Sequence, residues 1–312
     1  MSRVLVTGAS GFAGGHLVAA CEAAGDEVHA AARAVGVDLL DAEAARRAVA
    51  AARPEVVYHL AARAHVGFSW REPATTLREN LAMTANVLDA VRAEAPEATV
   101  VAVSSSEVYG PPERLPVDEA AGLRPQNPYA VSKASSDLLA GFYADAHGLR
   151  VIRARAFNHA GPGQEPVYAI ASFARQAAAA AEAGDGVLRI VTGNPDTRRD
   201  YTDVRDVVRA YRLLAQRAEP GVYNVASGVS RSARELIGCL AGIIGAELDH
   251  EVDPALMRPG EVMELRGSPA RLREATGWEP EIEIERTLAD TVQWWRGELR
   301  AGRAGTRVSE AG

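Results

Sequence analysis

Tyr129 and Lys133 stand four residues apart in the stretch Asn-Pro-Tyr-Ala-Val-Ser-Lys, which covers positions 127–133. If Pro128 lies in the first turn of a helix, this spacing brings both side chains onto one helix face, one turn apart. A phenol has a reference pKa of about 10, and a neighbouring ammonium favours the phenolate. The pair therefore predicts a tunable proton donor or acceptor, although the same spacing also arises by coincidence on solvated helix faces.

Lys133 is the only lysine of the chain, which has 34 Lys and Arg residues in total. Arginine therefore serves at every other position that carries a permanent positive charge. An ammonium is a compact charge with three donors and can lose its proton, whereas a guanidinium stays charged. The sequence thus indicates that position 133 requires an amine.

Three hydroxyls and a carboxylate follow a predicted strand at 100–103. They are Ser104, Ser105, Ser106 and Glu107. Open parallel sheets bind ligands just outside the carboxyl ends of their strands. We therefore expect this cluster to belong to the same site as the tyrosine and the lysine.

Gly8, Gly11 and Gly14 lie between a predicted strand at 4–7 and a helix that runs to about residue 24. Glycines let the backbone turn tightly and approach a pyrophosphate, whose charge is stabilised by the helix N-terminus. A glycine pattern alone also fits a plain tight turn. Because the strand and the helix both stand where a dinucleotide site needs them, we predict a nucleotide-binding loop.

The next predicted strand, at 27–32, ends in Ala-Ala-Arg with no acidic residue. An acid at this place would hold the adenosine ribose, whereas Arg33 can pair with a 2′-phosphate. The alternative is an ordinary surface arginine. Residues 37–41 are predicted to form a short strand ahead of a helix at about 42–52, and Asp38 either accepts from the adenine amino group or caps that helix.

The strand predicted at 56–60 ends in Leu60 and is followed by Ala61 and Ala62. The small side chains of the two alanines would let a cofactor lie close. His59 alternates within this buried strand, so we expect a hydrogen-bonded core residue rather than a catalyst. Residues 64–71 are expected to form a loop. A helix at about 73–94 follows, in which the amide of Asn80 can bond the backbone on the cofactor side.

Up to residue 157 strands and helices alternate, which predicts an α/β fold with a Rossmann-like, doubly wound parallel sheet. Further along, the expected elements are helices at about 167–183, 203–218, 231–244 and 285–300, strands at 187–191, 222–225 and 247–252, and a charged loop at 197–200. We expect a dinucleotide-binding domain at 1–157 with parts of 187–227, and a smaller mixed α/β region at 158–300 for substrate. Residues 301–312 are expected to be a disordered tail.

Composition narrows the function classes. The chain has 312 residues and a net charge of −7, which argues against a nucleic-acid-binding surface. No apolar run is long enough to span a membrane, and the N-terminus enters a strand without a secretory signal. The cysteines, Cys21 and Cys239, lack metal spacing, so we expect no metal and a cytoplasmic protein with reduced thiols.

Taken together, the glycines, the serine cluster, the tyrosine–lysine pair and Arg199-Asp200 resemble the extended short-chain dehydrogenase/reductase family over nearly the whole chain. Within that family the segments 104–110, 157–164 and 199–206 are most similar to the GDP-4-keto-6-deoxymannose reductases. The related GDP-mannose 4,6-dehydratases usually differ after Asn158-His159 but share Glu107, which serves there as a base.

The resemblance implies a set of roles. Tyr129 would protonate the ketone oxygen, Ser105 would hydrogen-bond it with Ser106 as a rival, Lys133 would hold the nicotinamide ribose, and Glu107 would support the substrate. The implied cofactor contacts are Gly8, Gly11, Phe12, Gly14, Arg33, Asp38, Leu39, Leu60, Ala61, Ala62, Asn80, Ser104, Tyr129 and Lys133. The implied substrate contacts are Ser106, Glu107, Asn158, Arg199, Arg258 and Glu261. The two arginines would clamp a diphosphate, although each alone is equally consistent with a surface salt bridge.

These roles predict an enzyme that reduces the 4-keto group of a nucleotide-diphospho-4-keto-6-deoxy sugar. The expected substrate is GDP-4-keto-6-deoxymannose, and the product a GDP-6-deoxyhexose, with NADP(H) preferred and NAD(H) usable as cofactor. The alternative is a GDP-mannose 4,6-dehydratase or a nucleotide-sugar 4-epimerase on the same scaffold. A non-catalytic dinucleotide sensor would not need Ser105, Tyr129 and Lys133 together. By resemblance, the helices at 73–94 and 129–147 are expected to pair in a homodimer.

Overall fold

The computed structural model describes residues 1–184, 186–257 and 261–302, and the chain divides into two compact units. Unit 1 comprises Met1–Phe157, Val207–Ala226 and Gly267–Glu279. Unit 2 comprises Asn158–Asp206, Ser227–Arg266 and Pro280–Gly312. Each unit has its own sheet and core, and the two are described separately.

Unit 1 is built on a six-stranded sheet in which every pairing is parallel, in the order β2-β1-β3-β4-β5-β9. The strands are β1 (Arg3–Thr7), β2 (Glu27–Ala31), β3 (Val56–His59), β4 (Thr99–Ser105), β5 (Arg150–Ala156) and β9 (Gly221–Val225). The chain passes from β1 to β2 on one side and then to β3 on the other. The predicted Rossmann-like, doubly wound α/β fold is confirmed, and the reversal at β1 creates a crevice where such sheets bind ligands.

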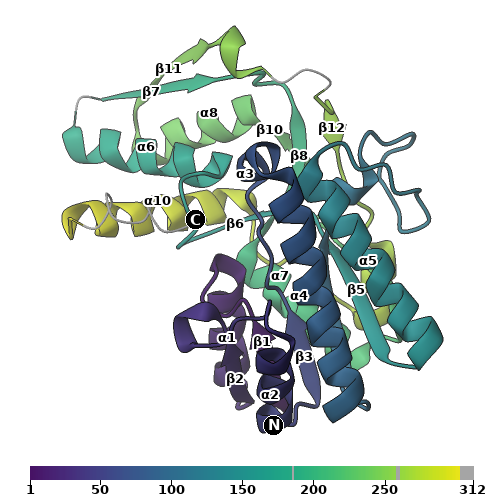
Figure 1. Ribbon diagram of the computed structural model, residues 1–312. Coiled ribbons are helices and arrows are strands. Elements are labelled where there is room, and N and C mark those ends of the chain that lie inside the picture. The colour runs from purple at the N-terminus through teal and green to yellow at the C-terminus, as the bar shows by residue number, and fades with distance from the viewer. Residues whose placement is uncertain (185, 258–260, 303–312) are drawn as a thin grey trace. The chain divides into compact units, whose positions relative to one another are not determined.

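Helices cover both faces of this sheet. On one face α2 (Ala42–Ala52), α4 (Pro73–Glu94) and α5 (Pro128–His147) pack side by side (Figure 1). Leu5, Val57 and Val100 point from the strands into their shared core. The strand residues between these point to the opposite face, because side chains alternate along a strand. There, buried Tyr58 lies near Cys21 of α1 (Phe12–Ala23) and Arg212 of α7 (Val204–Arg217).

Two segments in the N-terminal half of unit 1 differ from the sequence-based predictions. Residues 37–41 form a turn and no strand, so β2 is the edge of the sheet; the Asp38 carboxylate accepts from the Leu40 amide at 3.0 Å and closes this turn. Residues 64–71 contain the helix α3 (Val66–Arg71) instead of a loop. Its cap is His65, whose Nδ1 accepts from the Phe68 amide at 2.9 Å, and histidine is not among the usual capping residues.

Unit 2 packs three helices beside short strands. α6 (Ala169–Ala183), α8 (Ala233–Ile244) and α10 (Ile284–Arg300) share a core that includes Phe173, Leu240 and Trp295. β8 (Arg198–Asp203) pairs with β10 (Ser230–Ser232), β12 (Glu264–Leu265) and β6 (Asn158–Ala160). β7 (Val187–Thr192) and β11 (Glu247–Val252) form a separate parallel pair.

The predicted charged loop at 197–200 is therefore wrong, because these residues enter β8. The charged sequence gives no strand signal, because β8 is stabilised by pairing with strands from three distant segments. The short helix α9 (Ala270–Thr276) of unit 1 was also not predicted, and the 3-10 turns are η1 (Arg33–Val35), η2 (Ser106–Tyr109) and η3 (Pro254–Leu256).

Of the predicted tail, residues 303–312 lie outside the described residues. No helix in the described part of the chain has the length and apolar character needed to cross a bilayer.

Candidate active site

The glycine loop between β1 and α1 has almost no space for side chains. A Cβ on Gly14 would lie 2.0 Å from the carbonyl oxygen of Gly8, and one on Gly8 would lie 2.8 Å from the amide nitrogen of Ala61. Gly8 also has φ +69°, a conformation that favours glycine. Gly11 begins α1 without a side-chain cap, which leaves the first amides of the helix for an anion. The loop therefore fits the pyrophosphate of a dinucleotide, with Phe12 as the first residue of the helix.

Asn80 fixes the backbone that follows β3. Its Oδ1 accepts from the Arg63 amide at 2.7 Å, and its Nδ2 donates to the Arg63 carbonyl at 3.2 Å and to Ser132 Oγ at 2.8 Å. Leu60, Ala61 and Ala62 precede this clamped residue, and each is partly buried. Asn80 thus holds the backbone beside the glycine loop and links it to α5.

Arg33 follows β2 as an exposed side chain with two carboxylates nearby. Its Nε lies 3.5 Å from Asp38 Oδ1, and its Nη2 lies 3.9 Å from Glu79 Oε2. Asp41 caps α2, so Asp38 does not have the capping role that the sequence left open. Leu39, which directly follows Asp38, is buried.

Tyr129 and Lys133 lie on α5, and Pro128 occupies its first turn as predicted. The helix is capped by Asn127, whose Oδ1 accepts from the Ala130 amide at 2.8 Å. The Nδ2 of the same amide donates to Glu107 Oε2 at 3.0 Å. Asn127 therefore ties the helix of the tyrosine to the carboxylate after β4. The sequence analysis missed this role, although an Asn directly before Pro at a helix start is a recognisable cap signal.

Lys133 is 6% exposed, and its ammonium donates to the carbonyl of Val103 on β4. Burial lowers its pKa to about 8, and the negative charge of Asp137, one turn further along α5, opposes that shift. Asp137 in turn is held by the buried guanidinium of Arg155, with two contacts of 3.0 Å. An amine that can change its charge near neutral pH is thus held against the end of the central strand.

The serines after β4 differ in their surroundings. Ser105 Oγ accepts from the Glu107 amide at 3.2 Å, while Ser106 is buried at the start of η2. The buried Ser104 Oγ has no hydrogen-bond partner among the described residues. A buried hydroxyl without a partner costs free energy, so a polar group of a bound cofactor would complete its bonding.

His59 is confirmed as a hydrogen-bonded core residue. Its ring lies between Thr7 Oγ1 at 2.9 Å and Thr84 Oγ1 at 3.2 Å. Burial, with a smaller contribution from the charge of Lys133, lowers its pKa to about 3. The ring is therefore neutral at physiological pH.

The predicted substrate residues of the second region belong to unit 2. Arg199 lies in β8 and not in a loop, and its Nη1 donates to the carbonyls of Arg198 at 2.9 Å and Val262 at 2.8 Å. Asn158, on the neighbouring β6, bonds the side chain of Tyr201. Glu261 is partly buried, and Arg258 lies outside the described residues.

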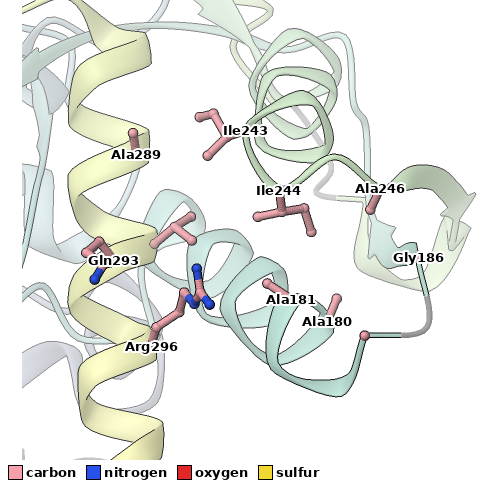
Figure 2. Close-up of a pocket in the computed structure, with 11 residues that line it drawn as sticks. Ala180, Ala181, Gly186, Ile243, Ile244, Ala246, Ala289, Gln293 and Arg296 are labelled. Atoms are coloured by element: carbon pink, nitrogen blue, oxygen red, sulfur yellow. The ribbon is translucent and has the colours of Figure 1, made fainter.

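Unit 2 also has a surface pocket of about 500 Å³ among α6, α8 and α10 (Figure 2). Alanine, glycine and isoleucine make up most of its lining. Of the described residues that line it, only Arg296 is charged, and its guanidinium pairs with Glu182 at 2.6 Å. None of the predicted site residues that the structure describes lines this pocket, so we assign it no part in ketone reduction.

Comparisons with known proteins identify the family of this chain. The family described as GDP-mannose 4,6-dehydratase matches residues 30–291. GDP-6-deoxy-D-mannose reductase of Pseudomonas aeruginosa is 41% identical over 301 residues, which cover 96% of this chain and 98% of that protein.

Two solved structures extend the similarity to the fold. The structure of RMD from Pseudomonas aeruginosa complexed with NADPH has a TM-score of 0.86 at 39% identity and covers 96% of this chain and 100% of that one. UDP-glucose 4-epimerase of Thermus thermophilus in complex with NAD has a TM-score of 0.85 at 32% identity, with 95% and 99% covered. The chain therefore belongs to the GDP-mannose 4,6-dehydratase family and is an NAD(P)-dependent enzyme of the extended short-chain dehydrogenase/reductase class.

Proposed function

We propose that this enzyme reduces the 4-keto group of GDP-4-keto-6-deoxymannose to give a GDP-6-deoxyhexose. The observation that carries the proposal is the buried Lys133 ammonium, one helical turn from Tyr129 and bonded to the end of β4. The similarity to a GDP-6-deoxy-D-mannose reductase over nearly the full length of both chains supports the choice of substrate.

A bound nicotinamide cofactor supplies the hydride for such a reduction. Reduction of the ketone places negative charge on its oxygen, and the Tyr129 hydroxyl would donate its proton to that oxygen. Ser105, held at the end of β4, donates a hydrogen bond to the same oxygen. The Lys133 ammonium would stabilise the tyrosinate that remains and would hold the ribose hydroxyls of the cofactor.

The cofactor part of the proposal is a preference for NADPH over NADH. Arg33 stands where an acidic residue would accept from the ribose, and its guanidinium can pair with a 2′-phosphate. Gly8, Gly11, Gly14 and Ala61 provide the close backbone approach that a pyrophosphate needs. Replacing Arg33 by Ala should raise KM for NADPH about tenfold or more and leave KM for NADH unchanged, because only NADPH carries the phosphate. Equal losses for both cofactors would contradict the preference.

On the substrate side, we assign unit 1 to the dinucleotide and unit 2 to the nucleotide sugar. Arg199 supports this assignment, because the bonds described for its guanidinium reach two carbonyls and leave other N–H groups for a diphosphate. Ser106, Glu107, Asn158, Arg258 and Glu261 are proposed as further substrate contacts by resemblance.

The second candidate function is a GDP-mannose 4,6-dehydratase, because Glu107 is held in place by Asn127 and a dehydratase needs a fixed base. A 4-epimerase shares the scaffold as well. The decisive experiment supplies enzyme and NADPH with GDP-4-keto-6-deoxymannose, and separately supplies GDP-mannose with NADP⁺. We expect one NADPH oxidised per ketone reduced and no 4-keto-6-deoxy product from GDP-mannose. Dehydration of GDP-mannose that disappears in Glu107→Gln would move the assignment to the dehydratase.

A homodimer through α4 and α5 is part of the proposal. Leu138 and Phe142 on α5 are 61% and 55% exposed, and Leu81 on α4 and Val131 on α5 are also exposed. Apolar side chains gathered on paired helices are typical of a protein–protein interface.

The cytoplasm is the expected compartment, since both cysteines are free thiols.

A further inference from the structure

We propose that Arg63 determines the cofactor preference without binding the cofactor: it neutralises Glu79 and so keeps Arg33 available for the 2′-phosphate. The inference rests on the proposed role of Arg33 and adds two residues that the sequence analysis did not single out. Arg63 is in this sense a positioning residue.

One carboxylate oxygen lies between the two arginines. Glu79 Oε2 accepts from Arg63 Nε in a short hydrogen bond, and the Nη2 of Arg33 lies 3.9 Å from the same oxygen. Arg63 is thus the primary partner of Glu79, and Arg33 is a second cation within ion-pair distance. The three side chains come from η1 after β2, the segment after β3 and the N-terminal third of α4.

Because Glu79 is buried, its carboxylate can attract Arg33 more strongly than the exposed carboxylate of Asp38 can. Its side chain is 11% exposed, whereas the side chains of Asp38 and Arg33 are 52% and 53% exposed. Solvent screens an ion pair between exposed groups and reduces its strength, but a buried carboxylate keeps a strong demand for a partner. If Arg63 did not satisfy Glu79, the nearest described cation would be Arg33.

Arg63 is fixed in place more firmly than Arg33. Its amide and carbonyl are both bonded by Asn80, and its guanidinium carbon lies 5.1 Å above the ring of Phe68. Its side chain is 23% exposed. A clamped arginine that already has a carboxylate cannot easily turn to a ligand, whereas Arg33 can exchange its weak contacts for a phosphate.

Substitutions at positions 63 and 79 should therefore have opposite effects. Arg63→Gln leaves Glu79 unpaired, so Glu79 pairs with Arg33 and competes with the 2′-phosphate. Glu79→Gln removes the competitor and leaves an additional uncompensated cation. In the double variant neither charge remains, and Arg33 is available again.

The test measures the dissociation constants of NADP⁺ and NAD⁺ by titration calorimetry for the wild type, both single variants and the double variant. We expect Arg63→Gln to weaken NADP⁺ binding roughly ten- to hundredfold with NAD⁺ unchanged, the range lost with one hydrogen bond to a charged group. Glu79→Gln should bind NADP⁺ at least as tightly as the wild type. The double variant should return to within about threefold of the wild-type NADP⁺ constant.

A matched control exists on α2 and α4, where Arg46 and Glu94 form an ion pair that faces no predicted ligand. Arg46→Gln, Glu94→Gln and their double variant should leave both constants unchanged. Should Arg63→Gln fail to fold, Arg63→Lys preserves the charge and should keep the wild-type ratio of the two constants.

The outcomes separate the inference from the proposed function. If the double variant binds NADP⁺ as weakly as Arg63→Gln, Arg63 contacts the phosphate itself and the inference is overturned. Equal weakening of NADP⁺ and NAD⁺ in Arg63→Gln overturns it as well, since that is the signature of a structural role. Arg33→Ala, measured in the same series, tests the proposed preference: only a loss confined to NADP⁺ supports it.

Discussion

The candidate site of unit 1 and the carboxylates of β8 in unit 2 use their charged and polar side chains in contrasting ways. In unit 2, Asp200 accepts from the Ser227 amide at 2.8 Å and the Gly228 amide at 3.0 Å, and Arg205 binds Asp203 and Asp290 at 2.7 and 2.9 Å. In unit 1, the buried Lys133 ammonium is bonded to a carbonyl, and Ser104 Oγ lacks a partner among the described residues. Fully paired groups stabilise a fold, whereas buried groups with incomplete pairing can still bond a ligand or exchange a proton.

This contrast can be tested by comparing which substitutions affect turnover and which affect unfolding. Substitutions at the incompletely paired groups of unit 1 should act mainly on kcat, apart from the pH-dependent change in stability expected at Lys133. Substitutions in the saturated pairs of unit 2 should do the reverse.

The largest effect is expected for Tyr129→Phe. Losing the proton donor should lower kcat by about 10²–10⁴-fold, the usual contribution of a positioned general acid. The thermal unfolding midpoint and the dissociation constant of NADP⁺ should stay close to the wild-type values, because only one hydroxyl is removed. A variant that keeps more than a tenth of the wild-type kcat would show that another group protonates the ketone.

Lys133 should give the next largest effect. Lys133→Arg keeps the positive charge, but a planar guanidinium cannot place a compact head between the ribose and the phenol. A small misplacement should lower kcat on the order of 10²-fold. Lys133→Met should be worse and should move the basic limb of the kcat–pH profile to higher pH, because the phenol then lacks its neighbouring cation. Wild-type turnover in Lys133→Arg would contradict a tyrosine–lysine couple.

The same lysine should make the unfolding free energy depend on pH. Burial lowers its pKa to about 8 from the reference of 10.5, so the unfolded chain binds more protons than the folded chain between these pH values. Stability therefore rises with pH across this window, and the cost of burying the charge is fully present below pH 8.

Relative to Lys133→Met, the wild type should accordingly gain roughly 1–3 kcal/mol of unfolding free energy between pH 8 and pH 10.5. Urea unfolding of both proteins at several pH values measures this difference. A difference that does not depend on pH would mean that burial does not lower the pKa of Lys133 in the folded protein.

Unit 2 offers a matched pair of arginines for a smaller effect. Arg199→Gln should raise KM for the nucleotide sugar about tenfold without a large change in unfolding free energy, since one charge-assisted contact is lost. Arg205→Gln should leave KM unchanged and lower stability instead, because the carboxylate of Asp203 is fully buried. If both substitutions act only on stability, Arg199 is a structural residue of β8.

The sequence allowed the dinucleotide fold to be predicted because its signals are local. A glycine loop lies between adjacent elements, and Pro128, Tyr129 and Lys133 fall within two turns of one helix. Burial of Lys133 and its bond to Val103 join positions 30 residues apart and depend on how α5 packs on β4. No spacing within the sequence reports such a contact.

The failures also have physical causes. Positions 197–200 were assigned to a loop because three of the four side chains are charged, but β8 has neighbours on both edges. The helix α3 was missed because its cap is a histidine ring. Glu79 lies in the interior of a predicted helix, where a glutamate usually faces solvent, and only the structure shows that it is buried beside two arginines.

Asn127 is expected to give the smallest effect and the most informative one, because its amide serves the fold and the site together. Asn127→Ala removes both the cap of α5 and the donor to Glu107, and the lost cap should lower unfolding free energy by about 1 kcal/mol. Asn127→Asp keeps an acceptor for the Ala130 amide but places a second carboxylate beside Glu107. Its stability should thus stay near that of the wild type while kcat falls, because the helix remains capped and Glu107 is repelled from its position. Denaturant unfolding and steady-state kinetics on both variants separate the two functions. If Asn127→Asp loses stability as Asn127→Ala does and keeps its kcat, Asn127 serves only the fold, and this part of unit 1 behaves like the saturated pairs of unit 2.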